Sequence, residues 1–76
     1  MTVAERVVGV IVQQLGVDAS EVTLLAKLRA DLGADDQQLA ALVAGLEEEF
    51  GIAIPDDDAW RLDSVRDVIQ YIETHA

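Results

Sequence analysis

Glycine and proline divide this chain into short segments, and within most of these segments the apolar residues recur at helical spacing. Gly16 and Gly51 each follow such a segment, where a glycine commonly ends a helix because it enters the left-handed region without steric cost. Pro55 disfavours helix at the residue before it, so residues 52–55 read as an extended connection. No stretch reads convincingly as a strand. The sequence therefore predicts an all-α fold.

The two longest helical segments precede these glycines. The first covers residues 3–15, and its apolar residues span an arc of roughly 200°, wider than one buried face requires. The second begins at Asp35 or Asp36 and ends before Gly51. Its apolar residues fall on one narrow face, and they are Leu39, Leu42, Val43, Leu46 and Phe50. We expect this second helix to be the most regular one.

Two further helices follow Pro55. The three carboxylates at 56–58 favour the start of a short helix, which we expect to end near Leu62. Asp63 or Ser64 caps a last helix, whose apolar stripe continues towards the C-terminal end. The predicted architecture is a four-helix bundle of three main helices and one short helix, formed as one domain by residues 1–76.

The segment 17–35 is long for a connection, but it carries apolar residues that should hold it against the helices. Two pairs of apolar residues are not accounted for by the predicted core. They are Leu24 and Leu25 in this segment, and Val8 and Val12 at one margin of the first helix. Either the segment covers the first helix and buries them, or they form a second contact face. We expect a monomer that self-associates weakly at most.

A net charge of −10 on 76 residues limits the choice of partners. It repels phosphate backbones and anionic lipid, so we expect no nucleic-acid or membrane partner, and it favours proteins with basic surface patches. The N-terminus carries no secretion signal, which predicts a cytoplasmic protein. The chain has no cysteine, and its one histidine, His75, lies near the end without a nucleophile beside it. We expect no catalytic residues, no metal site and no enzyme activity.

Four motifs, taken together, resemble acyl carrier proteins of the bacterial fatty-acid type. They are Asp-Leu-Gly-Ala-Asp at 31–35, Leu-Glu-Glu-Glu-Phe at 46–50, Ile-Pro-Asp at 54–56 and Val-Ile-Gln-Tyr-Ile at 68–72. The resemblance covers essentially the whole chain. It implies the four-helix fold predicted above, and a phosphopantetheine arm on a serine at the start of the second helix.

Asp36 stands at the position of that serine. Loading requires a hydroxyl that attacks the pyrophosphate of coenzyme A, whereas a carboxylate would give a labile mixed anhydride. Asp36 preserves helix capping, and the neighbouring Gln37 and Gln38 also depart from the family pattern, as do three alanines further along the helix. This favours natural divergence over a single engineered replacement. We therefore expect no 4′-phosphopantetheine and no other cofactor.

The resemblance also implies which residues bind partners. Asp35, Glu47 and Glu48 match positions that pair with basic residues of partner enzymes in the family. We add to them Asp36 and Gln37 at the altered helix start, and Trp60, the only tryptophan, which either anchors a contact or covers a core edge.

The leading hypothesis is a protein-interaction or regulatory module recognised by carrier-binding enzymes of fatty-acid biosynthesis or a polyketide-type pathway. The first alternative is acyl or aminoacyl carriage in fatty-acid or polyketide-type biosynthesis, with the arm attached elsewhere. The second alternative is a scaffold that binds a ligand in the bundle interior.

Overall fold

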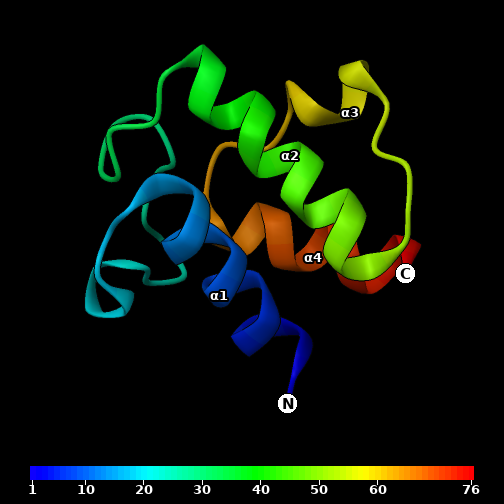
Figure 1. The fold of residues 1–76 in the computed structure, drawn as a ribbon, viewed down its shortest axis with the longest axis horizontal. Helices are drawn as coiled ribbons and strands as arrows, with labels where there is room; N and C mark the ends of the chain where they lie inside the picture. The colour runs from blue at the N-terminus through cyan, green and yellow to red at the C-terminus, as the bar shows by residue number, and fades with distance from the viewer.

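A computed structural model describes residues 1–76, and its elements are helical (Figure 1). The order is α1 (Val3–Leu15), a 3₁₀ turn η1 (Ala19–Glu21), α2 (Asp36–Phe50), α3 (Asp56–Ala59) and α4 (Val65–His75). The predicted all-α bundle of three main helices and one short helix is confirmed. The turn η1 was not expected from the sequence.

The three main helices begin in the same way. Thr2, Asp35 and Ser64 each accept a hydrogen bond from a backbone N–H three residues on, and the side chain there accepts one from the capping residue's N–H. These reciprocal bonds satisfy donors that the first helical turn leaves without partners. This local chemistry explains why their starting points could be predicted closely.

The short helix α3 differs from its predicted extent. It ends at Ala59 and not near Leu62, and the chain continues through turns in which Arg61 N–H donates to the Asp58 carbonyl. Pro55 precedes α3 and offers no side-chain cap. A helix of one turn without such a cap has little to hold it in α geometry, which accounts for its early end.

The core lies among α1, α2 and α4, with α3 on the outer side of α2 (Figure 1). A cluster of 14 buried residues fills it, with Val7, Ile11, Leu46, Val68 and Ile72 showing no exposed surface. Helices α1 and α2 approach closely at Gly45, where an added Cβ would lie 3.1 Å from Val10 Cγ1. No helix is long and apolar enough to cross a membrane.

The segment between α1 and α2 is partly packed down, as expected. Val22, Leu28 and Leu32 are buried, whereas Leu24 and Leu25 are 57% and 74% exposed. Val8 and Val12 are half-buried against the core. The segment is joined to the start of α4 by backbone hydrogen bonds, from Leu28 N to Asp63 O and from Val65 N to Ala26 O. The two leucines therefore lie on the surface of an otherwise anchored segment.

Candidate functional site at the start of α2

Asp36 occupies the first turn of α2, next to the capping residue Asp35. Its side chain is 80% exposed, and its carboxylate accepts a hydrogen bond from the guanidinium of Arg29 in the preceding segment. Both side chains are open to solvent, so the ion pair contributes at most about 1 kcal/mol. Position 36 thus presents a paired carboxylate and no hydroxyl.

Arg29 is the residue of this site that the sequence did not predict. It lies seven positions before Asp36, but helical periodicity does not relate the two residues because Arg29 lies in an irregular segment. The pairing depends on how the segment before α2 returns to the start of that helix. The one signal in the sequence was its positive charge, which is rare in a chain with five basic residues.

An apolar cavity of about 270 Å³ lies beside Asp36, between α2 and the α3 region. Asp36 and Arg29 line it together with Asp56, and its other lining residues are apolar: Leu28, Leu39, Ala40, Leu42, Val43, Leu46, Ala59, Trp60 and Leu62. The cavity combines apolar walls with a few polar groups, as is usual for small-molecule sites. It is therefore suited to an apolar chain that carries a polar end.

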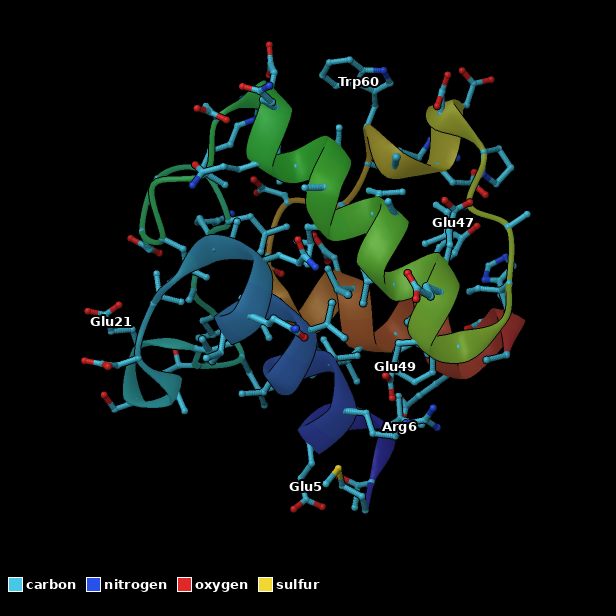
Figure 2. All side chains as sticks on the ribbon, in the orientation of Figure 1. Glu5, Arg6, Glu21, Glu47, Glu49 and Trp60 are labelled. Carbon is cyan, nitrogen blue, oxygen red and sulfur yellow. The ribbon has the colours of Figure 1, made fainter.

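The acidic run at the end of α2 contains three different environments. Glu47 is half-buried, and its Oε2 accepts a hydrogen bond from the Ile54 N–H at 2.8 Å. Glu49 Oε2 accepts one from Arg6 Nε at 2.9 Å, a pair that joins α2 to α1 (Figure 2). Glu48 is exposed and makes no hydrogen bond or ion pair. Of the two glutamates predicted to meet partners, only Glu48 is free.

The predicted site residues fall into two groups along α2. Asp35, Asp36 and Gln37 lie at its start, where the Asp35 side chain accepts a bond from Gln38 N and Gln37 is exposed. Glu47 is about 16 Å further along the axis, at 1.5 Å per residue. Trp60 follows α3, is 74% exposed, and lines the same cavity as Asp36. Helix α2 therefore separates the two acidic groups, while the cavity joins Asp36 to Trp60.

A second, polar groove runs between α3 and α4. Tyr71 OH donates to Asp58 Oδ2 at 2.7 Å, which raises the pKa of the tyrosine because the neutral phenol is the donor. His75 stacks on the Tyr71 ring with the ring centroids 3.9 Å apart. The Asp58–Tyr71 bond joins α3 to α4, whereas the stacked rings lie within α4. No group of three or more histidine, aspartate or glutamate side chains is arranged to hold a metal ion.

Comparison with known proteins places this architecture in a defined class. Residues 5–72 match the family described as the phosphopantetheine attachment site, a family of carriers and not of enzymes. The acyl carrier protein of Solidesulfovibrio magneticus is 52% identical over 73 residues, which are 96% of this chain and 94% of that protein. The acyl carrier protein of Helicobacter acinonychis is 48% identical over the same shares of the two chains. The chain belongs to the acyl carrier protein family.

The family match corrects the expectation that no 4′-phosphopantetheine is involved. The matched family is that of the phosphopantetheine attachment site, so 4′-phosphopantetheine is the prosthetic group to which the findings point. The expectation was wrong because it took the loss of a serine at one position for the loss of the group. Position 36 itself does not fit the group, because its carboxylate has no hydroxyl to form a phosphodiester.

Proposed function

We propose that this chain carries acyl groups in fatty-acid or polyketide-type biosynthesis. The observation that carries this proposal is the apolar cavity between α2 and α3, in a chain that aligns with acyl carrier proteins over 96% of its length. The cavity can take the apolar part of a cargo, while Arg29 and Asp56 lie within its lining to meet polar groups. Carriage also needs a covalently bound prosthetic arm, and it needs no catalytic residue.

The chain has two serines that could carry the arm, and they differ in exposure. Ser64 is 9% exposed and its Oγ already accepts the Asp67 N–H as the cap of α4. Ser20 is exposed in η1 and makes no side-chain hydrogen bond. We therefore propose Ser20 as the attachment residue in place of position 36.

Intact-protein mass spectrometry tests this proposal. The wild-type chain is incubated with coenzyme A and a broad phosphopantetheinyl transferase, in parallel with Ser20→Ala and Asp36→Ser variants. We expect a gain of one phosphopantetheine mass on the wild type and none on Ser20→Ala. A gain on both would keep carriage but move the attachment to another residue. A gain on Asp36→Ser alone would contradict carriage by the natural chain.

A second candidate is a protein-interaction or regulatory module that carrier-binding enzymes recognise. The specific observation in its favour is the Arg29–Asp36 pair, which fills the start of α2 with a charged contact while the capping box of Asp35 is kept. The outcome in which only Asp36→Ser gains mass would support this candidate over carriage.

In either role we propose a cytoplasmic monomer that binds pathway enzymes through their basic surface patches, and neither nucleic acid nor membranes. The net charge of −10 and the unpaired Glu48 support this choice. Glu48→Lys should weaken binding to such an enzyme. The same change at Glu47 would also break its bond to Ile54 N, so Glu48 is the cleaner test.

A further inference from the structure

Trp60 is a large aromatic side chain that is exposed to solvent, although its backbone is held in place. It is 74% exposed, and Figure 2 shows its indole projecting from the end of α3 away from the bundle. Its backbone is held, since its N–H donates to the Asp56 carbonyl at 3.1 Å. The preceding turn is fixed by the Asp58–Tyr71 bond of 2.7 Å and by the packing of Ala59 and Leu62 on the core.

The cavity that Trp60 lines is mostly apolar and has an acidic group in its lining. Ala40 and Val43 of α2 and Ala59 of α3 are among its apolar lining residues. Asp56 lines the same cavity and makes no side-chain hydrogen bond or ion pair. Arg61 lies in the groove between α3 and α4, and Arg29 is paired with Asp36. Of the three charged residues that line the cavity with Trp60, only Asp56 is unpaired, and its charge is negative.

Three of the four acidic side chains of α2 already have a partner within the chain, and Glu48 is the exception. Asp36 is paired with Arg29, Glu47 with the Ile54 N–H, and Glu49 with Arg6. A partner that used them would have to replace bonds that already exist. Asp56 and Trp60 are four residues apart, a spacing that places helical side chains on one face, and both are free to make new contacts.

We propose that Trp60, with Asp56 beside it, is the anchor by which this chain docks on its pathway enzymes. The partner surface is an apolar recess edged by arginine or lysine, which the indole fills while the carboxylate pairs with the cation. Tryptophan is enriched among the few interface residues that carry most binding energy, and desolvation in a recess strengthens the neighbouring ion pair. This inference rests on the proposed function, because it names the contact made with those enzymes.

The test uses the purified fatty-acid condensing enzyme of Solidesulfovibrio magneticus, an organism whose acyl carrier protein is 52% identical to this chain. Binding is measured by calorimetry at low and physiological salt. We expect Trp60→Ala to raise the Kd about tenfold or more. Asp56→Asn should raise it by a smaller factor, and should also reduce the dependence of the Kd on salt.

Leu25→Ala is the matched control, because Leu25 is also apolar and 74% exposed but lies in the segment between α1 and α2. It should leave the Kd unchanged. If Trp60→Ala binds as tightly as the wild type, or if both variants lose the same affinity, the anchor is overturned while the carrier function stands. If the wild-type chain does not bind the enzyme, both the anchor and the proposed partners are wrong. Circular dichroism of each variant verifies that the bundle is folded.

Discussion

Glu47 and Glu48 are adjacent in the sequence and differ in what they do. Glu48 is exposed, whereas Glu47 holds the connection between α2 and α3 by accepting the Ile54 N–H next to buried Ile54. The resemblance to the family implied partner binding for both. The difference arises because residue 47 faces the returning chain, a fact that depends on the path of residues 51–55.

Glu47→Ala should therefore destabilise the protein by about 1–2 kcal/mol, because it leaves the Ile54 N–H without its charged acceptor. Glu48→Ala is the control and should change the free energy of unfolding by no more than about 0.5 kcal/mol. Urea unfolding followed by circular dichroism measures both. Equal effects of the two substitutions would show that the Glu47 bond contributes nothing to stability.

Asp67 makes a pH-dependent contribution to stability. The backbone N–H of Ser64 donates to its carboxylate and holds its pKa below the ordinary value of 3.8, against the opposing effect of partial burial. Above pH 3.8 the stabilisation is fully present, and it is lost as the pH falls towards the lower folded pKa. Asp67→Asn should lower the free energy of unfolding by about 1 kcal/mol at pH 7. Below pH 4 the free energies of unfolding of the variant and the wild type should become more similar. If the difference in free energy of unfolding stays constant from pH 7 to pH 3, the Asp67 carboxylate makes no pH-dependent contribution.

At the scale of the elements, the contact between α1 and α2 depends on a residue without a side chain. Gly45 is in α2, where a Cβ would meet Val10 and Gln14 of α1 at 3.1 Å. Gly9 of α1 has no atom within 4 Å of the position of an added Cβ. The two glycines are thus similar in backbone conformation and opposite in packing.

Gly9→Ala should stabilise the protein by about 0.5–1 kcal/mol, because alanine has the higher helix propensity and meets no obstacle. Gly45→Ala should gain less or lose stability, since its methyl group pushes the helices apart. Thermal unfolding of the two variants and the wild type provides the comparison. An equal gain at both sites would mean that the helices are not in close contact at Gly45.

The sequence predicts those elements whose limits are local. The capping residues at 2, 35 and 64 and the glycines at 16 and 51 act on neighbouring backbone, so the main helices could be located from the printed chain. The Arg29–Asp36 pair and the bond from Ile54 N to Glu47 depend on how segments meet in space, and the turn η1 has no side-chain cap that would reveal it. The expectation about the cofactor was wrong for a different reason: it gave the altered start of the second helix more weight than the match of residues 5–72 to the phosphopantetheine attachment family.

The charge of the whole molecule should make its stability depend on salt. Three ion pairs occupy only a few of the fifteen acidic residues, so repulsion among the others opposes the compact state. Raising NaCl from 10 to 500 mM, concentrations at which the Debye length falls from about 30 Å to a few ångströms, should raise the midpoint of unfolding. Asp57→Asn removes one exposed and unpaired carboxylate. It should raise the midpoint of unfolding at low salt and reduce the change in that midpoint when NaCl is added. A midpoint that falls with salt would show that the ion pairs outweigh the repulsion.

The bonds between the first long connection and the start of α4 have a consequence for local opening. Leu28 N, Val65 N and Arg66 N donate across a sequence separation of about forty residues, and Leu28 and Val65 are each 1% exposed. These amides cannot open by fraying of one helix end, because both segments must separate together. In native-state hydrogen exchange they should be protected nearly as long as the amides of the core helices. The slowest-exchanging part of the protein thus includes residues that belong to a connecting segment.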